Sequence, residues 1–193
     1  LQDFDKYISL EPLDVDGYFH RGKVNNRLRN YKNAAKDLRI VTETETKNWT
    51  NWDYYRKAIS YNLLKEYSKE ILWLDSLILK NPNNEKLYYI KAIANRKLGN
   101  LELARQNLNK AIKINHDYKK AYNSRGILNL KSLRTKESIL DFRKTIEIDK
   151  TFFDGYTNLF FAYCLKHWYF LIGFVVSIFL FIRRKGFTKF FKK

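Results

Sequence analysis

The sequence predicts an all-α protein built as a solenoid of helix–turn–helix units that repeat about every 34 residues. The first observation is a period in the tyrosines, with spacings of 36, 34, 34 and 34 residues, at Tyr18, Tyr54, Tyr88, Tyr122 and Tyr156. The second is a small residue four positions after each of the first four tyrosines, at Gly22, Ala58, Ala92 and Gly126. A fixed period of this length is the signature of stacked supersecondary units, each too small to bury its apolar face alone.

Each unit divides into two helices joined by a turn, and residues 85–118 show the pattern most clearly. Tyr88, Ala92 and Asn95 are spaced by four and three residues, which places them on one face of a first helix. Gly99 then provides a stop signal and a turn. The same spacing continues through a second helix, at Leu101, Ala104, Leu108 and Ala111.

The unit has an aromatic residue at its fourth position, a small one at its eighth, and alanines at its twentieth and twenty-seventh. The third unit carries this set most completely, with Tyr88, Ala92, Gly99, Ala104 and Ala111. The pattern resembles the tetratricopeptide repeat (TPR) and covers residues 1 to about 165. The resemblance implies a right-handed superhelix of antiparallel helix pairs. Some positions depart from the TPR pattern: Glu70 replaces an alanine, and Thr46, His116 and Lys150 replace a proline.

The repeat register predicts how the chain is organised. The chain begins at Leu1 and contains no methionine, so we expect it to be a fragment of a longer protein. The predicted segments are the second helix of a truncated repeat (1–14), four TPR units (15–50, 51–84, 85–118 and 119–152), the first helix of a last partial unit (153–165), a transmembrane helix (166–185) and a basic tail (186–193).

The alignment of units also predicts two ion pairs. The seventh position holds a cation in each of the four units, and the residue sixteen positions later is an aspartate only where that cation is arginine. We therefore expect Arg21–Asp37 and Arg125–Asp141 to link the two helices of their units.

The TPR resemblance implies a concave groove, lined by the first helices, that binds peptides or helices of partner proteins. The register assigns positions two, five, nine, twelve and thirteen of each unit to this groove. The candidate partner-binding residues are Trp52, Tyr55, Ile59, Lys86, Tyr89, Ile93, Arg96, Lys97, Lys120, Asn123, Ile127 and Lys131. Aromatic and aliphatic side chains edged by Lys and Arg fit a partner segment that carries acidic groups.

Some TPR domains clamp the C-terminal carboxylate of heat-shock chaperones with a set of Lys, Asn and Arg residues. In one register those places hold Phe19, Lys23, Arg56, Lys86 and Ile90. Shifting the register by one unit gives Tyr55, Ile59, Ile90, Lys120 and Ser124. Only a lysine of the clamp survives in either register, so the sequence argues against this sub-family.

The C-terminal part contains an uncharged apolar run at residues 168–182, followed by Arg183, Arg184 and Lys185. Fifteen helical residues span roughly 22 Å, which is less than the roughly 30 Å of a hydrocarbon core. Lys166 and Arg183 at the two ends can reach toward the lipid headgroups, which would lengthen the membrane-spanning segment. The alternative is a capping helix that seals the end of the solenoid. A cap needs a polar outer face, whereas this segment is hydrophobic all round. The sequence therefore predicts a single-pass transmembrane helix. The positive-inside rule favours a cytoplasmic basic tail with extracytoplasmic repeats, whereas a tail anchor would leave the repeats in the cytosol.

The composition excludes several functions. The three histidines are scattered, Cys164 is the single cysteine, and no phosphate-binding loop or metal-ligand spacing is present. We expect no enzyme activity, no cofactor, no metal site and no small-molecule substrate, and we expect Cys164 to be buried. The net charge of +17 is compatible with an anionic membrane surface, an acidic partner or nucleic acid.

These features together predict a membrane-anchored scaffold or adaptor that holds other proteins in its groove. One alternative is a structural subunit of a membrane complex, in which the hydrophobic helix packs against other helices. A weaker alternative is a basic helical-repeat protein that binds nucleic acid. The positive charge favours this reading, but the basic residues are spread over all units and form no recognised nucleic-acid module.

Overall fold

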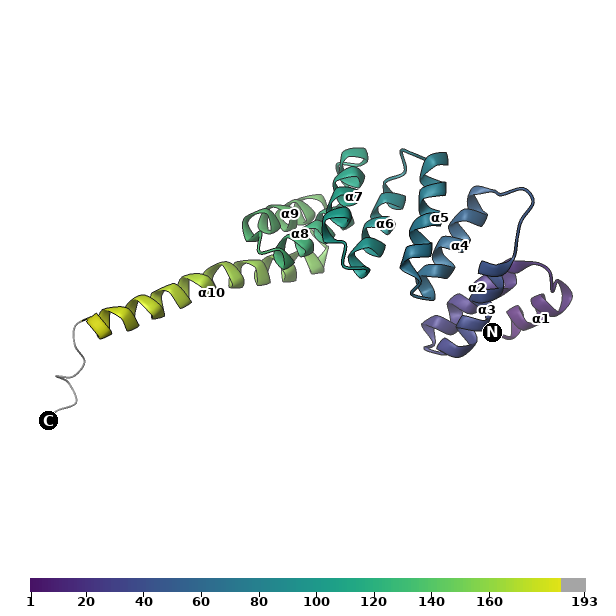
Figure 1. Cartoon of the computed structure of the whole chain (residues 1–193), viewed down its shortest axis with the longest axis horizontal. Coiled ribbons are helices and arrows are strands. Elements are labelled where there is room, and N and C mark those ends of the chain that lie inside the picture. Colours follow the sequence, from purple (N-terminus) through teal and green to yellow (C-terminus); the bar gives the residue numbers. More distant parts are fainter. Residues whose placement is uncertain (185–193) are drawn as a thin grey trace. The chain divides into compact units, whose positions relative to one another are not determined.

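The computed structural model describes residues 1–184, and every element of regular structure within them is a helix (Figure 1). This confirms the predicted all-helical solenoid. The chain divides into two compact units, Leu1–His116 and Asp117–Lys193. The first contains α1 (Gln2–Leu10), α2 (Val15–Arg27), α3 (Tyr31–Glu43), α4 (Asn51–Leu63), α5 (Tyr67–Lys80), α6 (Glu85–Lys97) and α7 (Leu101–Ile114). The second contains α8 (Lys119–Lys131), α9 (Thr135–Ile148) and α10 (Phe153–Arg184).

The helices form antiparallel pairs, α2 with α3, α4 with α5, α6 with α7 and α8 with α9. Each pair is joined by the same turn, in which one residue adopts a left-handed backbone. In each turn the next amide donates to the carbonyl five residues earlier, as in a Schellman motif. The left-handed residues are Arg29, Lys65, Gly99 and Leu133, with φ between 58° and 83°.

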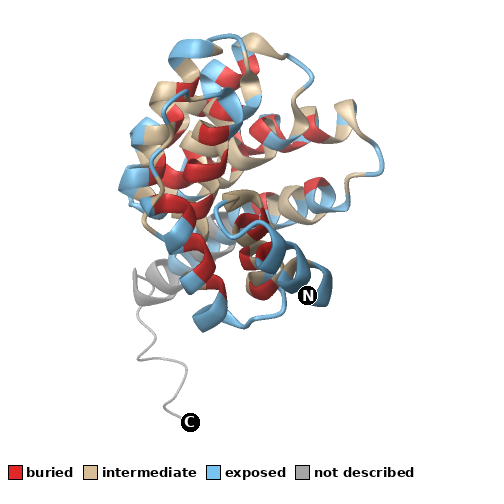
Figure 2. Cartoon of the chain, turned by 90° about the vertical axis from the view of Figure 1, so that its right-hand side faces the viewer, coloured by how far each residue is buried: buried red, intermediate tan, exposed pale blue. Residues whose placement is uncertain are grey.

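The core lies between the helices of each pair and, within the first unit, between successive pairs. Figure 2 shows the buried residues in red along these inner faces. In the first unit, Phe19 and Leu38 belong to one buried cluster, and Ala58 and Leu74 belong to the next. In the second unit, Phe142 packs with Ile139 and Ala162.

The small residues at the eighth position allow the close helix approach that the repeat requires. A Cβ added to Gly22 would lie 3.0 Å from the Leu38 side chain, and one added to Gly126 would lie 2.5 Å from the ring of Phe142. Ala58 and Ala92 occupy the same place in the other two units and are buried. Any larger side chain at these positions would push the paired helices apart.

Both predicted ion pairs are present. Arg21 donates to Asp37 with N–O distances of 2.9 and 2.7 Å, and Arg125 donates to Asp141 at 3.0 and 2.6 Å. Arg21 also reaches Asp5 of α1 at 2.7 Å, so this side chain joins three helices.

The C-terminal segment differs from the expectation. Residues expected as a repeat helix (153–165) and a separate transmembrane helix (166–185) belong to one continuous helix, α10, so a separate hydrophobic helix is not supported. No helix within the described residues is long and apolar enough to cross a membrane. Lys185 and the predicted basic tail (186–193) lie outside the described residues.

The start of α10 packs on α9 through Leu159, Ala162 and Tyr163. Beyond this contact several large apolar side chains are exposed, among them Phe161, Leu165, Trp168, Phe174 and Ile178. Cys164 is exposed as well, which corrects the expectation that it is buried. The helix turns Ala162, which is fully buried, toward α9 and leaves Cys164 on an outer face.

Candidate functional site

The unit Leu1–His116 contains a cavity of about 370 Å³ where the ends of three helices meet. The start of α4, the end of α5 and the start of α6 supply its walls. We call it the α4–α6 cavity. It is lined by Asn51, Trp52, Tyr55, Leu77, Asn81, Asn84, Lys86, Leu87 and Ile90. Its volume lies within the range of pockets that hold ligand groups.

Local hydrogen bonds at the helix ends fix the rim of the cavity. Thr50 and Asp53 form a capping box at the start of α4, with distances of 3.3 and 2.8 Å. The Asn84 side chain accepts from the backbone amide of Lys86 at 3.1 Å and caps α6. The Asn81 amide donates to a carbonyl in the last turn of α5 at 3.3 Å. The rim is therefore polar, and its amide groups are held in place.

The floor of the cavity is apolar. Leu77 and Leu87 are buried and belong to the hydrophobic cluster of α4, α5 and α6. Tyr55 and Ile90 pack against this cluster while remaining partly accessible. Trp52 is 40% exposed, so a large aromatic surface faces solvent beside an apolar floor.

Trp52 is held by aromatic neighbours from α2 and from its own helix, α4. Its ring stacks on Tyr55 with centroids 5.7 Å apart and meets the edge of Phe19 at 5.7 Å. His20 stacks on its other side at 6.4 Å and on Phe4 of α1 at 6.2 Å. An aromatic side chain constrained in this way loses little conformational entropy when a partner covers it.

The acidic groups near the cavity form hydrogen bonds and ion pairs within the protein. Arg56 is buried and forms ion pairs with Asp53 at 2.7 Å and with Asp16. Asp16 also accepts from the indole nitrogen of Trp52 at 3.0 Å. Burial alone would raise the pKa of Asp53, but hydrogen bonds to Thr50 and the charge of Arg56 outweigh it and lower that pKa. The Lys86 ammonium is exposed and has no ion-pair partner within the described residues, so it is available to a carboxylate of a partner.

Three of the sequence-predicted groove residues, Trp52, Tyr55 and Lys86, meet in the α4–α6 cavity. Ile59 instead packs against the core cluster that contains Phe19. The remaining candidates on α6 are Tyr89, Ile93 and Arg96, which are half-buried, and Lys97, which is exposed.

In the second unit, the predicted residues do not gather around a cavity of this kind within the described part. Lys120 and Lys131 are exposed on α8. The Asn123 side chain accepts a hydrogen bond from Asn158 of α10 at 2.9 Å, and Ile127 packs against the cluster around Phe142. These two side chains therefore contribute to helix packing.

The register missed the residues that complete the cavity: Asn51, Leu77, Asn81, Asn84, Leu87 and Ile90. Most come from helix ends and from the buried face of α6, which the groove positions do not include. The run of asparagines around Pro82 was the available signal, because Asn caps helices and terminates them.

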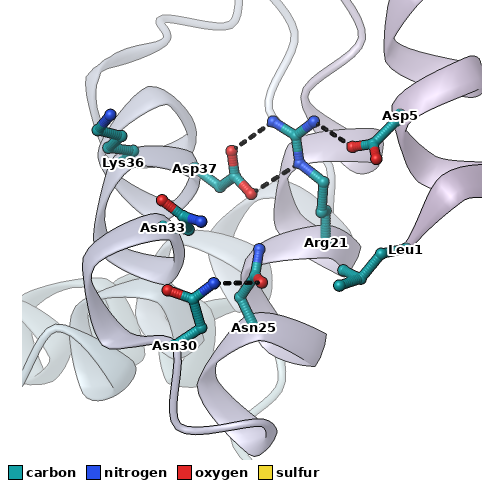
Figure 3. A pocket seen from close by; sticks show the side chains of 8 residues that line it. All are labelled: Leu1, Asp5, Arg21, Asn25, Asn30, Asn33, Lys36 and Asp37. Carbon is teal, nitrogen blue, oxygen red and sulfur yellow. Dashed lines mark hydrogen bonds and ion pairs between the residues drawn. The ribbon is translucent and has the colours of Figure 1, made fainter.

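A second cavity of about 300 Å³ surrounds Arg21 in the same unit (Figure 3). Figure 3 shows the guanidinium between Asp5 and Asp37, and the Asn30 amide pointing at Asn25. The hydrogen bond to Asp37 is the main reason that the pKa of Arg21 is raised. Because its aspartates are already engaged by Arg21, this cavity acts as a structural ion-pair site.

Within the described residues, no group of three or more His, Cys, Asp or Glu side chains is placed to hold a metal ion. Among the described residues, two acids have strongly shifted pKa values. Hydrogen bonds from Lys119 and Thr151 lower the pKa of Asp149 to about 2. The other acid is Glu70, whose carboxylate oxygens accept from the Asn62 amide at 3.0 and 2.9 Å. Burial raises the pKa of Glu70 to about 7. Glu70 lies inside the α4–α5 pair and is fully buried, so no substrate can reach it.

The stacked helix pairs and the exposed aromatic cavity define a helical-repeat protein. Residues 85–118 match the family model of the tetratricopeptide repeat, which is generally a non-enzymatic scaffold. No curated protein sequence matches the chain.

Solved structures share this fold. The first TPR domain of Spaghetti (RPAP3) bound to the HSP90 peptide SRMEEVD has a TM-score of 0.57 and 22% identity, covering 60% of this chain and 91% of that one. MamA from Desulfovibrio magneticus RS-1 has a TM-score of 0.61 and 18% identity, covering 78% and 84%. The Arabidopsis OM64 TPR domain has a TM-score of 0.55 and 23% identity, covering 58% and 93%. At these identities, the similarity establishes a TPR-type fold.

Proposed function

We propose that this chain is a protein-interaction scaffold that binds a peptide or helix of another protein on the groove face of its repeats. The groove face is the set of first-helix positions that carries Trp52, Tyr55 and Lys86. The observation that supports it is the α4–α6 cavity, where an exposed tryptophan and an unpaired lysine flank an apolar floor. Exposed Trp and Tyr in partly apolar pockets are the residues that dominate protein–protein binding energy.

The similar structures support this class of function without giving the partner. The RPAP3 domain carries an HSP90 peptide in its structure, and its helices superimpose on those of this chain. The residues of a chaperone carboxylate clamp are not reproduced here. Arg56, which occupies one of the clamp places, is buried and committed to Asp16 and Asp53.

The experiment is a selection of displayed random peptides of about twelve residues against the whole chain, followed by fluorescence polarisation with the selected peptides. We expect saturable binding that Trp52→Ala weakens at least about tenfold, or about 1.4 kcal/mol. Tyr31→Ala is the matched control, because Tyr31 is 61% exposed on a second helix, α3. If no peptide binds saturably, or if only the Tyr31 variant loses binding, the proposed function is wrong.

A further inference from the structure

We infer that the α4–α6 cavity recognises a bulky apolar side chain of the partner together with a carboxylate beside it. This inference rests on the proposed function and assigns a chemistry to the partner segment. The partner is thus a protein segment that combines Leu-like or aromatic residues with Asp or Glu.

The apolar part follows from the walls of the cavity. Its floor consists of the side chains of Leu77 and Leu87, with Tyr55 and Ile90 above them. At the rim, the Asn81 amide nitrogen donates to a backbone carbonyl and the Asn84 amide oxygen accepts from a backbone amide, so both side chains are partly engaged. An apolar side chain that enters the cavity buries the exposed face of Trp52 and displaces water from the apolar floor.

The acidic part follows from the charges around the cavity. Asp16 and Asp53 are paired with Arg56, and Glu85 accepts from the Asn115 amide at 3.4 Å and does not line the cavity. Lys86 lines the cavity and has no carboxylate partner within the described residues. A partner carboxylate can pair with Lys86, whereas the carboxylates of Asp16 and Asp53 are already engaged by Arg56.

Lys97 and Arg96 extend the positive character along the same helix. Lys97 is exposed, and the Nε atom of Arg96 is buried without a hydrogen-bond partner in the described part of the chain. The groove face of α6 therefore presents basic residues at both ends. A peptide with several acidic residues gains from each of them at low salt.

The test uses a labelled peptide with a central leucine, two glutamates on each side and Gly-Ser ends. Two matched probes replace the leucine by alanine or all glutamates by lysine. We expect the whole chain to bind the first probe at least about tenfold more tightly than either other probe. We expect Lys86→Glu to abolish that preference and to improve binding of the lysine probe. Lys113→Glu is the control for net charge, because Lys113 is exposed on α7 and does not line the cavity.

Fold integrity is checked by circular dichroism, and Lys86 is suited to this test because its side chain is exposed. Equal binding of the three probes overturns the inference. So does a loss caused equally by Lys86→Glu and Lys113→Glu, which would indicate only long-range attraction. If peptides from the random selection bind but lack an apolar–acidic pair, this inference fails and the proposed function stands. If no peptide of either kind binds, both fail.

Discussion

Glu70 is a buried carboxyl at the position where the repeat pattern has alanine. Its side chain is fully buried, and the Asn62 amide is its single hydrogen-bonding group within the described residues. Burial disfavours the charged form, which raises the pKa to about 7 from the ordinary value of 4.5. An alanine at this position would avoid the free-energy cost of burying a carboxylate. Glu70 therefore lowers stability at neutral pH but forms a polar contact between α4 and α5.

This carboxyl predicts a pH-dependent stability. Because the pKa of Glu70 is higher in the folded state, its contribution is fully present below about pH 4.5 and is lost as the pH rises through about 7. The difference corresponds to roughly 3 kcal/mol at most. Urea unfolding of the wild type and of Glu70→Gln at about pH 5 and about pH 8 measures it. We expect the wild type to lose stability relative to the variant at the higher pH. Parallel pH profiles for the two proteins would contradict this.

Gly126 predicts a steric cost at the closest approach of α8 and α9. A Cβ at this position would lie 2.5 Å from the Phe142 ring, which is fully buried and has no room to move. We expect Gly126→Ala to lower the free energy of unfolding by about 1–3 kcal/mol. Gly173→Ala is the matched control, because nothing lies within 4 Å of its added Cβ and alanine favours the helix. A stabilising effect of Gly126→Ala in chemical denaturation would contradict the packing described above.

At the scale of the elements, the four helix pairs use one turn geometry with different residues. Leu133 adopts φ of 58°, a backbone conformation that costs a non-glycine residue about 1 kcal/mol, whereas Gly99 occupies the same place without that cost. We expect Leu133→Gly to stabilise the protein by about 1 kcal/mol and Gly99→Ala to destabilise it by a similar amount. Thermal melts of the two variants should therefore shift in opposite directions. Shifts of the same sign would show that side-chain contacts, rather than the left-handed backbone conformation, determine the change in stability.

The Arg125–Asp141 pair ties α8 to α9 at a buried position. Asp141 is 5% exposed and also accepts from Asn129 at 2.9 Å, so loss of Arg125 leaves a buried carboxylate without its main partner. We expect Arg125→Met to cost about 3 kcal/mol in urea unfolding. Arg105 is the control, because its partner Glu102 is 62% exposed and its removal should change stability by less than about 1 kcal/mol. Equal effects of the two substitutions would mean that burial of Asp141 adds nothing.

At the scale of the whole molecule, the 34-residue period was sufficient to predict the helical fold and the residues at closest helix approach. The period arises because the same positions of each unit pack against the neighbouring helices. The α4–α6 cavity was only partly predictable, because Asn81 and Asn84 belong to a turn that the period does not constrain. The two extra residues between Tyr18 and Tyr54 also hid a contact: Trp49 stacks on Trp73, and the Lys57 ammonium lies 4.8 and 4.9 Å from their ring centroids. Hydropathy alone predicted a separate membrane helix, whereas residues 166–184 continue the repeat helix α10.

A stack in which each pair contacts its neighbours in sequence predicts that defects stay local. In the first unit α3 contacts α4 and α5 contacts α6, while contacts between helices distant in sequence are few. A core defect in α8–α9, such as Gly126→Ala, therefore removes packing from the helices beside it and leaves the Phe19 and Leu74 clusters intact. We expect hydrogen exchange of this variant, followed by mass spectrometry, to accelerate in α8–α10 and to remain unchanged in α2–α5.

The reciprocal experiment uses Gly22→Ala, which crowds Leu38 and should accelerate exchange in α2 and α3 first. Uniform acceleration along the whole chain in both variants would mean that the repeats unfold as one cooperative body, and stability could not then be assigned pair by pair.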